Sequence, residues 1–197
     1  MHVTILGRGP LAEPLSELAK RAGHTVGWAQ EAAISSDANE TELLILAGSS
    51  TAVEGVLASV ASFSPEDVIV VDASTPTQDD RAGDAARPAG SGTNWIAAGF
   101  PRARIVRAFA SVPAEALAAV LARPTSDQTV RLSVPLAGND RQAKVAVAKF
   151  MREIGVDPFD VGALTNAGVI DPGGALWGKA LNPVEMLEAV GWLSGDG

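Results

Sequence analysis

A glycine-rich turn near the N-terminus constrains the fold more than any other feature of the chain. The apolar run Val3–Leu6 leads directly into the turn Gly7–Ala12, after which leucines recur at the spacing of a helix. Gly23 then ends the helical pattern, and a second apolar run, His24–Trp28, follows at once. The segment therefore predicts a strand, a tight turn, a helix and a parallel strand, which together form one βαβ unit.

The turn carries the pattern GxGxxA, formed by Gly7, Gly9 and Ala12. Between a strand and a helix, the first glycine permits the tight turn, the second lets a diphosphate approach the backbone, and the small alanine lets the helix pack on the strand. A helix that begins at Pro10 directs free N–H groups and a partial positive charge at the phosphates. We therefore predict a dinucleotide site on this turn, including Leu11. The alternative is that the glycines only shape a βα turn.

Two further side chains bear on the coenzyme. Arg8 is placed to pair with a diphosphate or with the 2′-phosphate of NADP, or else is a solvated arginine. The second strand ends in Trp28-Ala29-Gln30, so the carboxylate or arginine that usually separates NAD from NADP is not there. Trp28 is a candidate for stacking on adenine, or it covers apolar surface. The sequence leaves the choice between NADP and NAD open.

The rest of the chain alternates between strand and helix patterns. Further strands are predicted at Leu43–Ala47, Val68–Asp72, Arg104–Phe109 and Val130–Ala137, and helices at Thr51–Ala61, Ala114–Ala122, Arg141–Ile154 and from Pro183. Short apolar runs of this kind are typical of buried parallel strands. The pattern predicts an α/β fold, Rossmann-like and doubly wound, with a mostly parallel sheet in a single domain over residues 1–197.

The region after the second strand is short. Only 14 residues, Ala29–Glu42, precede the strand that begins at Leu43. One crossover alone uses about 10 to 12 residues, so the strand and helix that usually come next do not fit. We expect the second strand to be an edge of the sheet.

Composition excludes several classes of function. With 15 Lys plus Arg against 23 Asp plus Glu, the formal charge is −8, which argues against binding to nucleic acid or to an anionic membrane. The absence of cysteine and the two separate histidines leave no expected metal site. The longest uncharged stretch, Pro88–Pro101, has 14 residues and is broken by glycine and proline, so we expect no membrane span and a cytoplasmic protein.

Polar side chains cluster where strands are predicted to end. These candidates are Ser49, Ser50, Ser74, Thr75 and Ser111, which could orient a carboxamide or simply complete the strands. No GxSxG elbow makes any of them a nucleophile, and we assign no catalytic residue.

Asp72 is the best placed carboxylate for an acid or a ribose contact, whereas Asp171 is an ordinary turn residue. His24 is expected to be structural. The segment Gly174–Lys179 is either an apolar lid or a tail that docks on the sheet or on a second subunit, so a homodimer stays open.

Several motifs taken in order resemble the F420-dependent NADP oxidoreductase family. They are the GxGxxA turn, the strand Arg104–Phe109 with Ala110–Ala114, the segment Val134–Asp140, the helix Arg141–Ile154 and the segment Val161–Ala167. In that family a Rossmann domain holds NADP beside a deazaflavin, and hydride passes between the two rings. The resemblance implies phosphate on Gly7–Leu11 and nicotinamide near Ala47-Gly48-Ser49, Ser74-Thr75-Pro76 and Ala110.

The leading hypothesis is therefore an oxidoreductase that binds NADP or NAD. It would transfer hydride to or from coenzyme F420 or another small acceptor, and its partners would be those small molecules. Few titratable side chains are found among the candidate site residues. This agrees with a ring-to-ring hydride transfer, which depends on orientation more than on an acid or base. The alternative is a Rossmann-like module that has lost catalysis and serves in nucleotide sensing or protein interaction. A methyltransferase-like nucleoside binder is the third hypothesis.

Overall fold

The computed structural model describes residues 1–29, 41–49, 68–75, 103–124 and 131–191. The strands are β1 (His2–Leu6), β2 (Thr25–Ala29), β3 (Leu43–Leu46), β4 (Ile69–Asp72), β5 (Arg104–Ala108), β6 (Ser133–Gly138) and β7 (Asp157–Asp160). The helices are α1 (Ala12–Arg21), α5 (Ala114–Ala122), α6 (Arg141–Glu153), the 3-10 helix η3 (Leu164–Val169) and α7 (Pro183–Ala189). The predicted helix Thr51–Ala61 lies outside the described residues.

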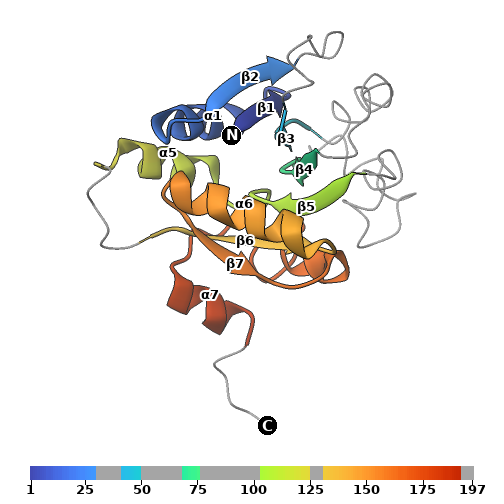
Figure 1. Cartoon of the computed structure of the whole chain (residues 1–197). Coiled ribbons are helices and arrows are strands. Elements are labelled where there is room, and N and C mark those ends of the chain that lie inside the picture. The colour runs from blue at the N-terminus through green and yellow to red at the C-terminus, as the bar shows by residue number, and fades with distance from the viewer. Residues whose placement is uncertain (30–40, 50–67, 76–102, 125–130, 192–197) are drawn as a thin grey trace.

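One sheet joins the seven strands in the order β2-β1-β3-β4-β5-β6-β7 (Figure 1). β1 to β5 are mutually parallel, β6 is antiparallel to β5, and β7 is parallel to β6. This is the predicted α/β fold, Rossmann-like and mostly parallel. β2 is an edge strand, as the short connection to Leu43 required.

Two details of the sheet differ from expectation. The strand near Val130–Ala137 was expected to be parallel, but β6 runs against β5, with Arg107 opposite Ala137. An apolar run reads the same in either direction, so its orientation depends on the connection and not on the strand itself. β7 was not predicted because Asp157-Pro158-Phe159-Asp160 offers no apolar run. It tolerates proline because it lies at the edge of the sheet.

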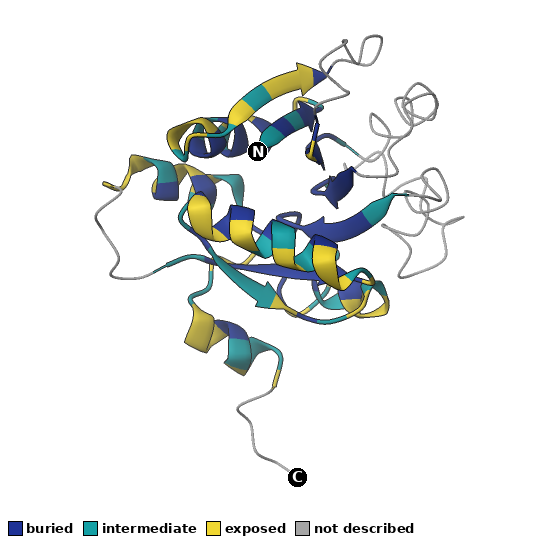
Figure 2. Ribbon diagram, in the orientation of Figure 1, coloured by how far each residue is buried: buried dark blue, intermediate teal, exposed yellow. Residues whose placement is uncertain are grey.

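The main hydrophobic core lies between one face of the sheet and helices α1, α5 and α6 (Figure 2). Alternate strand residues such as Ile5, Ile45 and Val106 point into it, because successive side chains of a strand face opposite sides. α6 contributes Val147 and Phe150 from its buried stripe. Helices α1, α5 and α6 thus cover this face of the sheet.

The second face of the sheet carries a smaller core beneath η3 and α7. Its members include Ala137 of β6, Ile170, Leu176 and Met186, all buried. The segment after β7 therefore folds back across the sheet instead of ending at its edge. This second face is also where the alternation of β5 places Arg107, since Val106 and Ala108 both belong to the main core.

Helix α1 begins at Ala12 rather than at Pro10 as expected. Pro10 and Leu11 form the turn before it, and Ala12 N donates to Gly9 O at 3.0 Å. Pro14 is consequently the third helical residue, where the backbone N–H needs no intrahelical acceptor. The later start also explains why a second proline is tolerated so near the first.

At the amino edge of the sheet, His24 precedes β2 and packs on α6. Its ring lies 5.2 Å from that of Phe150, and its Nε2 is 3.4 Å from Glu153 Oε2. Burial lowers the pKa of His24, and the nearby N-terminal ammonium group lowers it further, while Glu153 acts in the opposite direction. His24 thus links the start of β2 to α6, at the amino ends of the parallel strands and away from the carboxyl ends that carry the predicted site residues.

No described helix is long and apolar enough to cross a membrane.

Candidate functional site

The glycine turn after β1 packs against the loop that follows β3. Gly7 has φ +100°, and a Cβ there would lie 2.8 Å from Gly48 N. A Cβ on Gly9 would lie 2.7 Å from Ala47 O, and Gly9 N already donates to that oxygen at 2.7 Å. Both glycines are thus required by contact between two backbone segments. This contact accounts for them without a ligand, so the case for a dinucleotide must rest on the rest of the turn.

The remaining groups of the turn suit an anion. Leu11, the residue before α1, has no side chain that could accept hydrogen bonds from the first helical amides. The N-terminal N–H groups of a helix then carry a partial positive charge that favours an anion. Arg8 is exposed beside them, and the acidic residue of the first turn is Glu13. Arg8 would therefore attract a phosphate held there, and Glu13 would repel it.

The turn lies at the point where the chain changes direction across the sheet. From β1 the chain passes to β2 on one side, and β3 then pairs with β1 on the other side. In open α/β sheets, ligands bind outside the carboxyl ends of the strands at such a switch point. β1, β3, β4 and β5 are all parallel, so their carboxyl ends share one edge.

The predicted residues after β3 and β4 are linked directly. Thr75 N donates to Gly48 O at 3.2 Å, and Ser49 and Thr75 form an isolated parallel bridge. Ser74 is buried, and its backbone N and Oγ donate to Asp72 Oδ1 at 3.0 and 2.6 Å. The structure thus brings the two predicted strand ends together as one hydrogen-bonded unit. Ser50 and Pro76 lie outside the described residues.

A buried ion-pair cluster lies beneath these strand ends. Asp72 and Arg107 are directly opposite in the β4–β5 register, with Arg107 Nη1 2.9 Å from Asp72 Oδ2. The other side of the guanidinium meets Asp171, whose Oδ1 accepts from Nε and Nη2 at 3.1 and 2.8 Å. Asp72 is fully buried and Arg107 is 2% exposed. Asp72 is therefore held as the partner of an arginine, which leaves little room for the acid or ribose role considered from sequence.

Neither Arg107 nor its bond to Asp171 was found from the sequence. Arg107 lies inside an apolar run and was counted as part of a strand, while Asp171 was taken for an exposed turn residue. Its side chain is in fact only 15% exposed. The signal that could have found the pair is the charge itself, because an arginine in a central strand must be matched by buried carboxylates.

The turn after β5 contains the predicted residue Ala110 and has unusual geometry. Phe109, which is buried, has φ +65°, a conformation that non-glycine residues rarely adopt. Val112 N donates to Phe109 O at 2.9 Å, and Gly178 N donates to Ser111 O at 2.8 Å. Ser111 Oγ is buried without a hydrogen-bond partner in the ranges described. The segment near Gly178 therefore docks on the end of β5, as one of the two sequence hypotheses for Gly174–Lys179 proposed.

Trp28 stands at the carboxyl end of the edge strand β2, opposite Ile5 of β1. It is 39% exposed, an unusual degree for so large an apolar side chain. It lies on the β2 side of the switch point, while Ser74 and Ala110 lie on the β4 and β5 side. The predicted residues thus line the sheet edge on both sides of the glycine turn.

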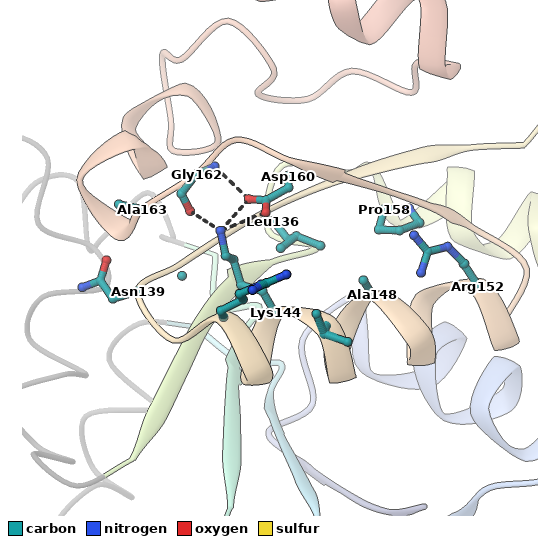
Figure 3. A pocket seen from close by; sticks show the side chains of 12 residues that line it. Leu136, Asn139, Lys144, Ala148, Arg152, Pro158, Asp160, Gly162 and Ala163 are labelled. Atoms are coloured by element: carbon teal, nitrogen blue, oxygen red, sulfur yellow. Dashed lines mark hydrogen bonds and ion pairs between the residues drawn. The ribbon is translucent and has the colours of Figure 1, made fainter.

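A groove of about 640 Å³ lies elsewhere, between α6 and strands β6 and β7 (Figure 3). Lys144 projects from α6 across it, and its Nζ binds Asp160 Oδ1 and Oδ2 at 3.0 and 2.8 Å and Gly162 O at 3.3 Å. Leu136, Ala148 and Pro158 supply its apolar lining. None of the predicted site residues lines this groove.

The described residues also contain no group of three or more His, Asp or Glu side chains placed to hold a metal ion.

Comparison with known proteins supports the architecture. The chain superimposes on a hypothetical protein from Sinorhizobium meliloti with a TM-score of 0.72 at 23% identity, covering 92% of this chain and 95% of that one. The chain has a Rossmann-like α/β fold. It also superimposes on a protein from Arthrobacter sp. FB24, provisionally named an F420-dependent NADP reductase, with a TM-score of 0.63 at 20% identity, covering 84% and 86% of the two chains.

A larger enzyme shares the same core. The chain matches 3-hydroxyisobutyrate dehydrogenase from Mycobacterium tuberculosis with a TM-score of 0.58 at 16% identity, covering 85% of this chain but 56% of the enzyme. No protein-family model and no curated protein matches the sequence. At these identities the likeness shows the fold alone.

Proposed function

We propose that the protein is an oxidoreductase that binds NADP or NAD along the carboxyl edge of β2, β1, β3, β4 and β5. The observation that carries the proposal is the position of the glycine turn. It lies at the switch point of the sheet, directly before a helix whose first amides have no side-chain cap. Ala12 N already donates to Gly9 O and Pro14 has no N–H, so Arg8 and the backbone N–H groups of Leu11 and Glu13 would hold the diphosphate. Trp28 would stack on the adenine.

The nicotinamide would lie on the other side of the turn, near Gly48, Ser49, Ser74, Thr75 and Ala110. The distance from β2 to β5 is four strand spacings, about 19 Å, which suits an extended dinucleotide. Ser111 Oγ is a buried polar group without a described partner, so a carboxamide could satisfy it. When bound, the coenzyme supplies the hydride, and these residues orient its ring.

A deazaflavin of the F420 type is the acceptor we favour. The ordered resemblance to F420-dependent NADP oxidoreductases supports it, as does the fold shared with a protein provisionally given that name. The charged side chains at the ends of β4 and β5, Asp72 and Arg107, neutralise one another and are buried. Transfer between two rings needs no acid or base at that position, whereas reduction of a carbonyl or imine normally needs a proton donor.

Calorimetric titration tests the binding step. We expect saturable binding of NADPH or NADH with a Kd in the micromolar range, which corresponds to roughly 8 kcal/mol of binding free energy. S-adenosylmethionine serves as the matched negative probe, because a methyltransferase-like protein would bind it instead. Folded protein that binds neither coenzyme would contradict the proposal.

Turnover then separates the proposed reductase from a module without catalysis. Loss of the visible absorbance of oxidised F420 in the presence of NADPH, at about one turnover per second or faster, is the expected result. A protein that binds NADPH yet reduces no F420 would favour the second candidate, a nucleotide-sensing module. The observation in favour of that candidate is that the glycines are already explained by the Ala47–Gly48 contact.

A further inference from the structure

Arg107 connects the strand ends of the proposed nicotinamide site to the C-terminal segment of the chain. Besides its pairing with Asp72, Nη1 donates to Ser74 O at 2.9 Å. Its other face is bound by Asp171. The guanidinium therefore links β5, from which it projects, to the end of β4 and to the turn that begins at Asp171, which lies 64 residues further along the chain.

On the β4 side, this contact reaches the neighbouring loop through the backbone. Ser74 is followed by Thr75, which is hydrogen-bonded to Gly48 and bridged to Ser49. The ends of β3 and β4 thus share one backbone network, and Arg107 binds that network at a carbonyl group.

On the C-terminal side, residues 171–178 follow a closely constrained path. Gly174 packs so tightly on Gly168 and Val169 that a Cβ would overlap their backbone, with Val169 C at 2.6 Å. Leu176 N donates to Val169 O at 2.9 Å, and Gly178 N then donates to Ser111 O. The segment that Asp171 anchors at one end therefore supports the turn after β5 at its other end.

That turn needs such support. Phe109 holds a backbone conformation that costs free energy and persists only when surrounding contacts impose it. The following residues, Ala110 and Ser111, are those expected to meet the nicotinamide ring. A turn under strain and fixed by a distant segment is suited to set the shape of a binding site.

We infer that Asp171 and Arg107 are positioning residues for the nicotinamide half of the coenzyme. They would act by holding segment 171–178 against the turn Phe109–Val112, without touching the ligand. This inference rests on the proposed function. The adenosine half would lie near Trp28 and the glycine turn, on the far side of β3 and β4, where the pair has no described contact. The pair should therefore affect one half of the coenzyme and spare the other.

The test compares two ligands on one variant. Asp171→Asn keeps the size of the side chain and removes its charge, and Asp157→Asn is the matched control because Asp157 pairs with Arg131 in a half-exposed contact of 3.4 Å. Calorimetry on the full chain measures the Kd of whichever coenzyme the wild type binds and of ADP-ribose, or of its 2′-phosphate if that coenzyme is NADPH. We expect Asp171→Asn to weaken the coenzyme about tenfold and ADP-ribose less than twofold, and Asp157→Asn to change neither.

A second variant guards against misfolding of the first. Gly178→Ala strains the same segment at its other end, because Gly178 has φ +70°, which alanine rarely adopts. Its Cβ would meet no other atom, so the effect would come from the backbone and not from a clash. The same selective loss, about threefold, is expected. Equal weakening of both ligands, or no weakening of either, would overturn the inference while leaving the proposed function intact. A wild type that binds ADP-ribose but neither coenzyme would contradict the oxidoreductase proposal itself.

Discussion

Asp72 and Arg107 occupy opposite positions in the adjacent parallel strands β4 and β5, and their charged atoms meet at 2.9 Å inside the sheet. Burial of such a pair is costly unless each remaining polar atom finds a partner. Here Ser74 donates twice to Asp72, and Asp171 accepts twice from Arg107. The cluster is thus a satisfied network that joins the sheet to the C-terminal segment.

Removal of the arginine should destabilise the protein strongly. Arg107→Met would remove the arginine that pairs with the buried Asp72 carboxylate, and we expect a loss of about 3–5 kcal/mol in the free energy of unfolding, measured in urea. Adding Asp72→Asn should recover part of that loss because it removes the buried charge that Arg107 would no longer balance. Arg131→Met, which breaks a half-exposed pair, should cost less than about 1 kcal/mol. Similar losses for both arginines would show that burial does not govern the effect.

Gly9 should matter even without any ligand. In Gly9→Ala the new Cβ would lie 2.7 Å from Ala47 O, so we expect the apo protein to lose about 1–3 kcal/mol of stability. Gly27→Ala is the matched control, since its nearest contact would be an ordinary 3.8 Å from Thr4 Oγ1. Thermal unfolding of both variants measures the difference. An apo Gly9→Ala protein as stable as wild type would mean that the turn and the Ala47 loop do not pack as described.

The two charged residues of the turn should change coenzyme affinity in opposite directions. Arg8→Gln removes a cation beside the diphosphate, and about a tenfold loss in affinity is expected at low salt. Glu13→Gln removes a carboxylate from the first turn of α1, and affinity should rise a few-fold. Both effects should shrink as salt is raised, because exposed charges are screened. Changes of the same sign in the two variants would argue against a phosphate at this position.

Stability should depend on pH through His24. Burial lowers its pKa from 6.5, so the unfolded chain takes up a proton more readily than the folded protein. The contribution is fully present above pH 6.5 and is lost as the pH falls through the lowered value, with a slope of at most about 1.4 kcal/mol per pH unit. Urea unfolding at several pH values should show the decline in wild type and a flatter profile in His24→Gln. An unchanged profile in the variant would assign the dependence to other groups.

The sequence predicted the fold where local patterns decide it. The change from apolar run to glycine turn to helical spacing located β1 and α1, and the short stretch before Leu43 identified β2 as an edge strand. Features that depend on distant partners could not be predicted. The pairing of Arg107 with Asp171 spans 64 residues, and the direction of β6 cannot be predicted from its apolar run. The close contact of Gly9 with Ala47 likewise arises only once β3 pairs with β1.

A crystal of the protein soaked with NADPH would show directly where the two linked phosphates bind. We predict density for the diphosphate against the backbone of residues 8–12, with adenine toward Trp28 and nicotinamide toward Ser74 and Ala110. Density for the diphosphate at any other place, or a bare turn at saturating NADPH, would contradict it.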